Sequence, residues 1–173
     1  MTDDIRFQAL GIKLVVMDVD GTLTDGAMYF SAIGEELKRF STRDGMGVTL
    51  LHRAGIRTAI ITSERSEIVV RRADKLRISE VILGSHDKTT ALNELASRCS
   101  VALNDIAYIG DDINDLHAMQ LCGLSACPSD AVQAIRHVAT YTCHAPGGNG
   151  AVREFAELIL TSQGHPVTLP EQW

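Results

Sequence analysis

The sequence has few aromatic residues, few prolines and no excess of positive charge. Phe, Trp and Tyr make up 5% of its 173 residues, and proline occurs four times. The 16 lysines and arginines are outnumbered by 22 aspartates and glutamates, which gives a formal net charge of −6. This balance does not favour a nucleic acid or an anionic membrane as a partner. No apolar run approaches the roughly 20 residues that a membrane-spanning helix needs.

Cysteine is also scarce, and its spacing argues against a thiolate metal site. None of the four cysteines belongs to a CxxC pair; they are Cys99, Cys122, Cys127 and Cys143. The first ten residues, MTDDIRFQAL, lack the basic segment and apolar stretch of a secretory signal peptide. We therefore expect reduced thiols in a cytoplasmic protein.

The rest of the composition is that of an ordinary globular protein. Hydrophobic residues make up 45% and charged residues 22% of the chain, which argues against disorder. At ~100–200 residues per domain, the length allows one domain with a substantial core. No repeat, linker or low-complexity tract divides the chain, so we expect a single domain over residues 1–173.

Short apolar segments alternate with helical ones along the chain. Strands are predicted at Ile12–Met17, Thr58–Ile61, Val81–Leu83, Ile106–Ile109 and Leu124–Cys127. Helices are predicted near Asp44–Ala54, Ser66–Leu76, Lys88–Cys99, Asn114–Leu121, Ala131–Val138 and Gly150–Ser162. Strands that are apolar throughout and separated by helices indicate a parallel sheet covered on both faces. The expected fold class is therefore α/β with a doubly wound parallel sheet, in which sites lie at the carboxyl ends of the strands.

One segment interrupts this alternation. Residues 27–41 hold two short β-prone stretches around a glycine-containing turn, which predicts a β-hairpin inserted beside the expected site. An isolated hairpin is marginally stable in water, so we expect it to pack against something, for instance another subunit. The tail at 164–173 contains two prolines and cannot continue the last helix; it is either a frayed end or an arm that docks elsewhere.

The strongest chemical signal follows the first predicted strand. Asp18 and Asp20 stand two residues apart, directly before a glycine turn, so an extended chain places both carboxylates on the same side. Clustered carboxylates are costly unless a cation compensates them. Hard oxygen ligands suit Mg²⁺, which usually also binds a substrate phosphate. A solvated acidic turn is the competing interpretation.

Three further strand ends carry polar groups. A carboxylate cluster that begins with Asp111 and Asp112 follows one strand; it can complete an octahedral metal site, although part of it also suits a helix cap. Thr62 and Ser63 follow another, with a hydroxyl and backbone N–H groups able to hold a phosphate oxygen. Lys88 opens a helix and can supply a positive charge to a phosphate, although alone it would be an ordinary surface lysine.

Asp-x-Asp, Thr, Lys and Asp-Asp, in that order at four strand ends, resemble the four motifs of the haloacid dehalogenase-like hydrolase superfamily. The resemblance implies that Asp18 is the nucleophile that forms an aspartyl-phosphate. It implies that Asp20 protonates the leaving alcohol and then deprotonates the hydrolytic water. Thr62 and Lys88 would hold the phosphoryl group.

The same resemblance implies a bound Mg²⁺ ion. Its ligands would be Asp18, Asp111 and the backbone carbonyl of Asp20. Asp112 or Asp115 would contact these ligands, rather than the ion, and orient them. Phosphoryl transfer needs mostly positioning and charge neutralisation, and these groups supply both.

Many members of this superfamily cover the site with a cap domain, for which this chain has no room. A capless chain with RDGMG at 43–47 and GGNGAVRE at 147–154 resembles the sugar-acid phosphatases of the superfamily. That family is typically tetrameric, with hairpins packed together and neighbours covering each site. The resemblance therefore implies a homotetramer that acts on a small phosphorylated sugar acid.

The segment after the expected phosphate-binding threonine favours one substrate class. Glu64, Arg72 and Lys75 fall close together on a helix of 3.6 residues per turn, where the carboxylate would accept sugar hydroxyls and the cations would attract a substrate carboxylate. Ser63 and Gly148 are further expected contacts to phosphate or substrate. The pattern resembles phosphatases of nine-carbon nonulosonate 9-phosphates (KDN or N-acetylneuraminate type) slightly more than those of 3-deoxy-D-manno-octulosonate (KDO) 8-phosphate in lipopolysaccharide synthesis. A solvated charged helix face is the competing interpretation.

A receiver-like signalling domain is a remote alternative. Receiver domains share the doubly wound sheet, an acidic Mg²⁺ site, a phosphorylated Asp, a Thr or Ser, and a Lys. Asp20, two residues after the expected nucleophile, favours rapid hydrolysis over a lasting phospho-aspartate.

Overall fold

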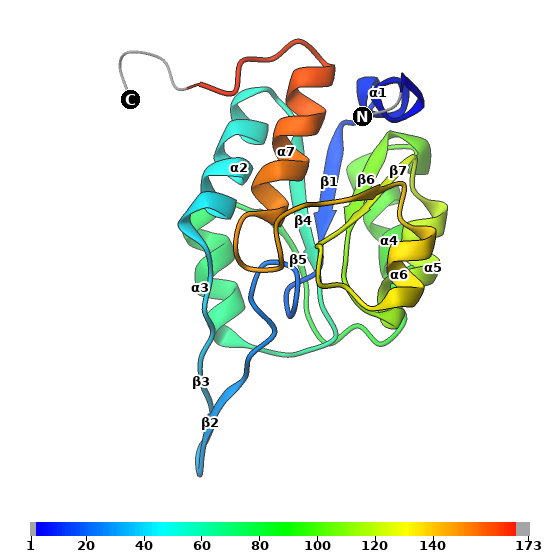
Figure 1. The fold of residues 1–173 in the computed structure, drawn as a ribbon. Helices are drawn as coiled ribbons and strands as arrows, with labels where there is room; N and C mark the ends of the chain where they lie inside the picture. The colour runs from blue at the N-terminus through cyan, green and yellow to red at the C-terminus, as the bar shows by residue number, and fades with distance from the viewer. Residues whose placement is uncertain (1–2, 169–173) are drawn as a thin grey trace.

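Six parallel strands form one sheet in the computed structural model, which describes residues 3–168 (Figure 1). The strands are β1 (Leu14–Met17), β4 (Arg57–Ile61), β5 (Glu80–Ile82), β6 (Ile106–Ile109), β7 (Leu124–Cys127) and β8 (Tyr141–Thr142). Their order is β5-β4-β1-β6-β7-β8, and every pairing is parallel. Because β1 lies between β4 and β6, the carboxyl ends of these three strands are neighbours.

The central strands are apolar throughout because both of their faces are covered. β1, β6 and β7 are buried along their whole length. Along β1, Val15 and Met17 belong to the core on one face of the sheet, whereas Leu14 and Val16 belong to the core on the other. This division follows from the two-residue period of a strand. Each such side chain contributes about 1.5–3 kcal/mol through burial.

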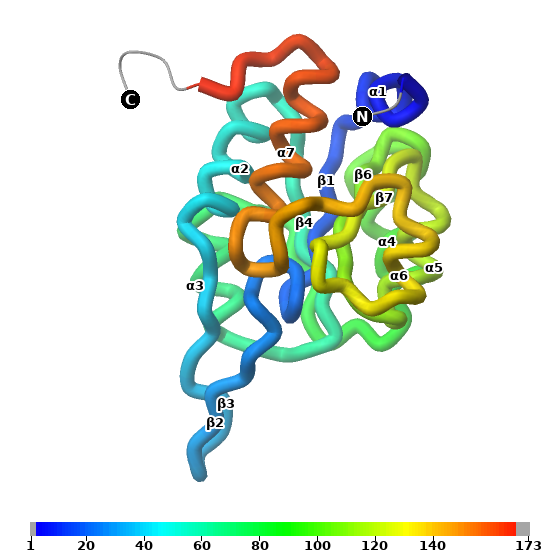
Figure 2. The backbone as a smooth tube through the Cα atoms, in the orientation of Figure 1, coloured from blue at the N-terminus to red at the C-terminus, as the bar shows by residue number. Residues whose placement is uncertain are grey.

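Helices cover both faces of the sheet (Figures 1 and 2). One layer holds α2 (Thr42–Arg53), α3 (Glu67–Leu76) and α7 (Ala151–Ser162), with α1 (Asp3–Leu10) beside α7. The other layer holds α4 (Lys88–Cys99), α5 (Leu116–Leu121) and α6 (Gln133–Val138). Two 3₁₀ turns, η1 (Leu103–Asp105) and η2 (Ile113–Asp115), lead into β6 and α5.

The inserted hairpin consists of β2 (Tyr29–Ser31) and β3 (Gly34–Leu37), paired antiparallel. It extends away from the body at the carboxyl end of the sheet (Figures 1 and 2). Its large apolar side chains are exposed, and Ile33 at its tip reaches 91% exposure.

The structure confirms the doubly wound parallel sheet, the predicted strands and the hairpin, and no cap domain occurs within residues 3–168. It adds α1 and β8, which the sequence did not predict: α1 buries only Ala9, and β8 has two residues, so neither has a clear apolar pattern. Of the predicted tail, residues 169–173 lie outside the described residues. No helix in the described part of the chain is long and apolar enough to cross a membrane.

Candidate active site

The carboxyl ends of three adjacent strands bring the predicted residues together. Asp18 follows the central strand β1, Thr62 follows β4, and Asp111 comes two residues after β6. Asp18 and Thr62 are buried, at 5% and 1% exposure. Parallel strands end at the same edge of a sheet, so residues separated by more than forty positions in the sequence converge there.

Lys88 reaches this edge from the first residue of α4. Its Nζ atom lies 2.6 Å from Oδ1 of Asp18 and 2.6 Å from Oδ1 of Asp115. The side chain of Lys88 is 1% exposed, so the lysine is part of a buried ion-pair network. Asp87 caps α4 by accepting a hydrogen bond from the backbone N–H of Thr90, which fixes where Lys88 enters the site.

Asp115 is the centre of the hydrogen-bond network that supports the site. Besides Lys88, its Oδ1 accepts a hydrogen bond from the hydroxyl of Tyr108 at 2.8 Å. Its Oδ2 accepts from the backbone N–H groups of Asp111 at 3.1 Å and Asp112 at 3.4 Å. The geometry therefore places Asp115 as the residue that orients the Asp111 loop and Lys88, whereas the carboxylate of Asp112 accepts a hydrogen bond from Ile113 N–H.

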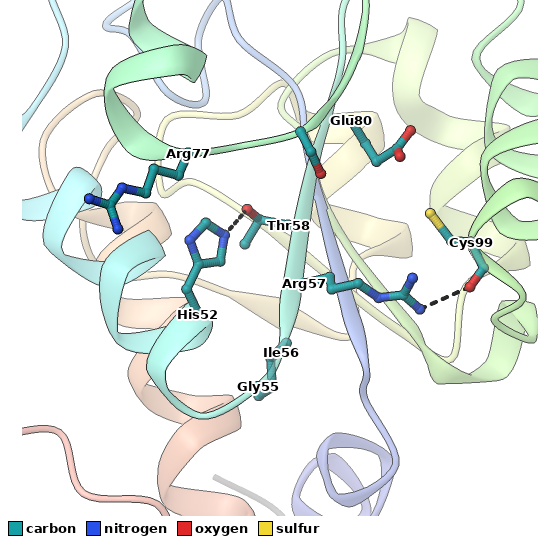
Figure 3. Close-up of a pocket in the computed structure, with 9 residues that line it drawn as sticks. His52, Gly55, Ile56, Arg57, Thr58, Arg77, Glu80 and Cys99 are labelled. Carbon is teal, nitrogen blue, oxygen red and sulfur yellow. Dashed lines mark hydrogen bonds between the residues drawn. The ribbon is translucent and has the colours of Figure 1, made fainter.

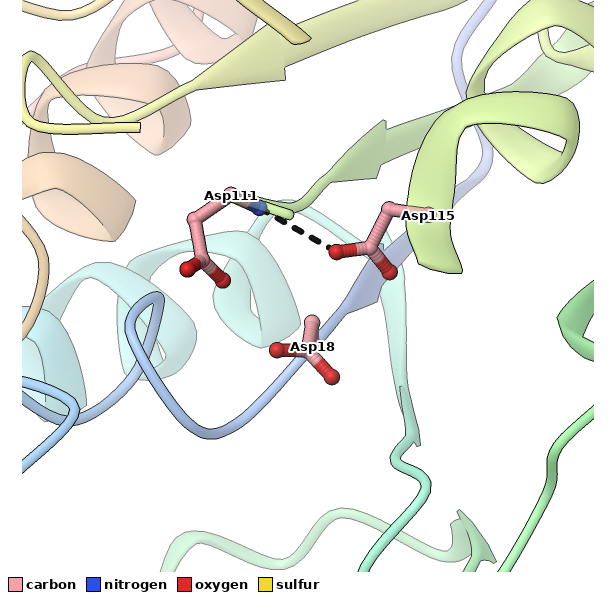
Figure 4. A group of neighbouring side chains, drawn as sticks. All are labelled: Asp18, Asp111 and Asp115. Atoms are coloured by element: carbon pink, nitrogen blue, oxygen red, sulfur yellow. Dashed lines mark hydrogen bonds between the residues drawn. The ribbon is translucent and has the colours of Figure 1, made fainter. Parts of the chain in front are cut away.

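The carboxylates of Asp18, Asp111 and Asp115 point toward one another (Figure 4), and each offers an oxygen within 4.8 Å of the others. Burial and the charge of Asp115 raise the pKa of Asp18 well above its usual range, and the same causes raise the pKa of Asp111 to about 6. Lys88 alone does not balance this negative charge. A cluster of hard oxygen donors with uncompensated charge fits a divalent cation such as Mg²⁺.

Asp20 lies at the rim of the same site and is held by the hairpin segment. Lys38, the residue after β3, donates to Oδ1 of Asp20 at 2.5 Å and lies 2.6 Å from Oε1 of Glu35. Oδ2 of Asp20 is buried and has no hydrogen-bond partner among the described residues.

A small hollow opens between these groups. Its volume is about 190 Å³, and it is lined by Asp18, Asp20, Thr62, Ser63, Glu64, Asp112 and Asn114. The Thr62 hydroxyl accepts a hydrogen bond from the Glu64 N–H at 3.3 Å. Ser63 donates to the carbonyl of Ser85 and accepts from the side chain of Asn114. These hydrogen bonds fix the loop after β4, whose residues line the hollow together with Asp18.

Gly148 contacts the turn that carries Asp20. Its N–H donates to the carbonyl of Thr22 at 2.9 Å, and its φ of +58° is one that L side chains rarely adopt. A Cβ at the neighbouring Gly147 would overlap the carbonyl oxygen of Gly21. This glycine pair therefore packs backbone against backbone under the Asp18–Asp20 turn, and the expected contact of Gly148 to substrate stays a prediction.

Glu64 does not lie on the helix of Arg72 and Lys75, contrary to the expected single face, and the expected substrate contacts of these three residues stay predictions. Helix α3 begins at Glu67 after the N-cap Ser66, so Glu64 lies in the preceding loop, and the period of the helix does not reach it. Glu64 does line the hollow beside Asp18.

The two cations of that expected face lie against α2. Arg72 donates to the carbonyl of Ser41 at 2.9 Å, and its guanidinium carbon lies 5.4 Å from the ring centroid of Phe40. Lys75 lines a separate hollow with Thr49 and other side chains of α2. Neither Lys75 nor Arg72 lines the hollow at Asp18.

A further hollow, of about 380 Å³, lies at the amino-terminal end of β4. His52 is hydrogen-bonded to Thr58 there, and Arg57 donates to the carbonyl of Cys99 (Figure 3). Arg77 points in a different direction from Arg57 (Figure 3). This hollow is larger than the one at Asp18, but its polar groups do not converge, so it is a poor candidate for catalysis.

Three residues that contact the site are not predicted from the sequence: Lys38, Glu35 and Tyr108. Tyr108 carried a usable signal, because a hydroxyl in the fully buried strand β6 needs a hydrogen-bond partner. Lys38 and Glu35 carried none, because a lysine and a glutamate in a hairpin are ordinary solvent-exposed residues.

Comparison with known proteins gives a consistent result. A family model for haloacid dehalogenase-like hydrolases matches residues 58–155. The KDO 8-phosphate phosphatase KdsC of Yersinia pestis is 40% identical over 163 residues, covering 94% of this chain and 87% of the relative. The Moraxella catarrhalis KDO 8-phosphate phosphatase, solved with a magnesium ion, a phosphate ion and KDO, has a TM-score of 0.92 and 43% identity, covering 95% of this chain and 94% of its own. The cobalt-bound Haemophilus influenzae enzyme has a TM-score of 0.89 and 39% identity, covering 91% and 92%.

These relatives are named for KDO 8-phosphate. The expected slight preference for a nine-carbon nonulosonate 9-phosphate is therefore not supported, and the eight-carbon alternative fits better. The receiver-like alternative is not supported either, because the family matched is one of hydrolases. The chain belongs to the haloacid dehalogenase-like hydrolases and is an enzyme of their phosphatase group.

Proposed function

We propose that this protein is a Mg²⁺-dependent phosphatase that hydrolyses KDO 8-phosphate to KDO and inorganic phosphate. The observation that carries the proposal is the 43% identity, over 95% of this chain, to the Moraxella enzyme described with magnesium, phosphate and KDO. The convergence of Asp18, Thr62, Lys88 and Asp111 at one sheet edge supports it, since these residue types suit phosphoryl transfer.

Asp18 is the nucleophile in this proposal. One of its carboxylate oxygens attacks phosphorus, the bond from phosphorus to the sugar oxygen breaks, and an aspartyl-phosphate forms. Lys88 holds Asp18 at 2.6 Å and offsets charge that collects on the phosphoryl oxygens. Thr62 and Ser63 line the same hollow and would bind those oxygens.

The metal site would use Asp18, Asp111 and the backbone carbonyl of Asp20. A bound Mg²⁺ ion supplies positive charge that neutralises phosphate and carboxylates together. Thr22 donates to Oδ1 of Asp111 at 3.0 Å, and Asp115 holds the backbone of Asp111, so the ligand is oriented before any cation arrives.

Asp20 is the general acid and base. It gives a proton to the sugar oxygen as the ester bond breaks, and then takes a proton from the water that attacks the aspartyl-phosphate. That second attack releases inorganic phosphate and restores Asp18. Asp20 lines the hollow together with Asp18, as both transfers require.

The exposed hairpin supports a homotetramer. Tyr29, Phe30, Ile33 and Leu37 present apolar side chains that are 46–91% exposed, a surface that monomers rarely leave uncovered. We propose that hairpins of four copies pack together and that neighbouring copies cover the hollow at Asp18. The four cysteines are free thiols, which suits a cytoplasmic enzyme.

The substrate proposal is tested by Mg²⁺-dependent phosphate release. We expect kcat/KM for KDO 8-phosphate to exceed that for a nine-carbon nonulosonate 9-phosphate at least about tenfold, the discrimination that one extra carbon unit can produce. The reverse preference would restore the nine-carbon interpretation, and release from neither substrate would overturn the proposal.

The tetramer is tested by light scattering coupled to size-exclusion chromatography. Ile33→Asp places a charge on the tip of the hairpin, so we expect it to yield smaller species with an unchanged circular dichroism spectrum. Glu36→Gln, on the same hairpin, is the matched control. A monomeric wild type would overturn the assembly.

A further inference from the structure

Lys38 is a buried lysine that joins the hairpin to the active site. It follows β3, its side chain is 0% exposed, and its ammonium lies between Asp20 Oδ1 at 2.5 Å and Glu35 Oε1 at 2.6 Å. The second oxygen of Glu35 accepts a hydrogen bond at 2.6 Å from Ser66, the N-cap of α3. A continuous polar chain therefore runs from α3 through the hairpin to Asp20.

The charged groups along this series of polar contacts stabilise one another. Burial alone would lower the pKa of Lys38, but its hydrogen bonds to Asp20 and Glu35 raise it. Burial would raise the pKa of Glu35, but the hydrogen bonds from Lys38 and Ser66 lower it. Both groups are therefore charged at neutral pH, and charge-assisted hydrogen bonds of this kind hold a side chain in one orientation.

The two oxygens of Asp20 stand in different surroundings. Lys38 holds Oδ1, whereas Oδ2 is buried and has no hydrogen-bond partner among residues 3–168. A carboxyl group that transfers protons must keep a fixed orientation toward the substrate, and the contact of Lys38 with Oδ1 prevents rotation of the Asp20 carboxylate.

We propose that Lys38, anchored by Glu35, is a positioning residue that holds the carboxylate of Asp20 in one orientation through its contact with Oδ1. The proposal rests on the proposed function, because Asp20 acts there as general acid and base. Lys38 itself does not contact the substrate, since its side chain is buried. The hairpin thus contributes to catalysis within its own subunit, independently of any role in assembly.

A comparison of two substrates separates positioning from a general loss of structure. The alcohol of KDO 8-phosphate must be protonated as it leaves, whereas p-nitrophenolate leaves without a proton. Because kcat/KM reports only the steps up to the first irreversible one, it depends on the acid for the first substrate and much less for the second.

We expect Lys38→Met to lower kcat/KM about 100-fold on KDO 8-phosphate and less than about fivefold on p-nitrophenyl phosphate, with KM nearly unchanged. Lys13→Met removes an exposed lysine paired with Asp105 and serves as the matched control with wild-type values. Equal losses on both substrates would overturn the proposal, because a structural or purely electrostatic role affects both. If the wild-type enzyme hydrolyses p-nitrophenyl phosphate but not KDO 8-phosphate, the proposed substrate is overturned instead.

Two further variants guard against a folding defect in Lys38→Met. Glu35→Gln keeps the shape and removes the anchoring charge, so we expect a loss of about tenfold confined to KDO 8-phosphate. In an Asp20→Asn background, adding Lys38→Met should lower kcat/KM on KDO 8-phosphate by less than about threefold. A residue that acts through the Asp20 carboxylate has nothing left to position in that background. A full additional loss in that background would overturn the proposal.

Discussion

Two buried lysines bridge carboxylates at this site, and the two clusters balance their charge differently. Lys88, at 1% side-chain exposure, lies in the core of the sheet edge. Lys38, at 0%, lies at the base of the projecting hairpin. Each makes two ion pairs of 2.5–2.6 Å, so distance alone does not distinguish them.

The carboxylates around Lys88 remain short of positive charge. The side chains of Asp18 and Asp115 are 7% and 0% exposed, and burial together with their mutual repulsion raises the pKa of Asp18. Asp111 adds a third carboxylate to the same cluster. Such a cluster is stabilised by an additional cation.

The two carboxylates around Lys38 are paired with this lysine and remain partly exposed to water, although Oδ2 of Asp20 has no hydrogen-bond partner among the described residues and Oε1 of Glu35 has none there besides its contact with Lys38. Asp20 and Glu35 keep 25% and 16% of their side chains exposed, and hydrogen bonds from Lys38 and Ser66 lower the pKa of Glu35. The comparison teaches that the larger excess of negative charge accompanies the predicted metal and phosphate site, whereas the smaller and more exposed cluster around Lys38 holds a side chain in place.

The largest expected effect is on the chemistry of the first cluster. Asp18→Asn removes the nucleophile but keeps a polar group beside Lys88, so we expect phosphate release to fall at least about 10³-fold. Circular dichroism should show the fold retained. Residual activity within tenfold of wild type would contradict the role of Asp18.

The two lysines should differ in what they contribute to stability. Lys88→Met removes the positive charge paired with two almost fully buried carboxylates, so we expect a loss of about 3–5 kcal/mol in the free energy of unfolding. Lys38→Met should cost less, because water still reaches Asp20 and Glu35. Urea denaturation of both variants without Mg²⁺ measures the difference, and equal losses would remove the distinction drawn above.

Adding Mg²⁺ should stabilise the first cluster in a pH-dependent way. At pH 8 and a metal concentration of 100 Kd, we expect the free energy of unfolding to rise by about 2.7 kcal/mol. Below pH 6 the gain should shrink, because the pKa of Asp111 is raised to about 6 and a protonated carboxyl group is a poor ligand. Denaturation midpoints between pH 5 and 8, with Mg²⁺ and with EDTA, test this expectation.

The smallest expected effect concerns Asp111 in the metal-free protein. Its pKa is about 6 in the folded chain against an ordinary 3.8, so the folded state binds the proton more tightly. Its favourable contribution is present below pH 4 and is lost as pH rises through 6. The free energy of unfolding of Asp111→Asn, measured relative to wild type, should therefore be about 2 kcal/mol higher at pH 8 than at pH 4. A pH-independent difference would contradict this shift.

The reliable sequence predictions depended on local position. Asp18, Thr62 and Asp111 each follow a buried apolar strand, and parallel strands necessarily end at one edge of the sheet. Their convergence could therefore be predicted from the pattern of strands, without any knowledge of how the helices pack.

The unreliable predictions depended on contacts between elements. The helical period predicts a shared face for Glu64, Arg72 and Lys75, but α3 begins at Glu67 after the N-cap Ser66 and leaves Glu64 in a loop. Arg72 is directed at the start of α2 by its hydrogen bond to Ser41 and its contact with Phe40. No periodicity within one segment reports which neighbouring helix a long side chain will meet.

The sequence by itself determined the alternating strands and helices, the hairpin, and the set of polar residues at the strand ends, because burial patterns and chain spacing are local properties. Only the tertiary structure decided how those residues are held. Lys38 meets Asp20 because the hairpin folds back on the turn after β1, and Lys88 meets Asp115 across 27 residues. Such pairings depend on the packing of whole elements, since a buried charge is stable only where that packing supplies its partner.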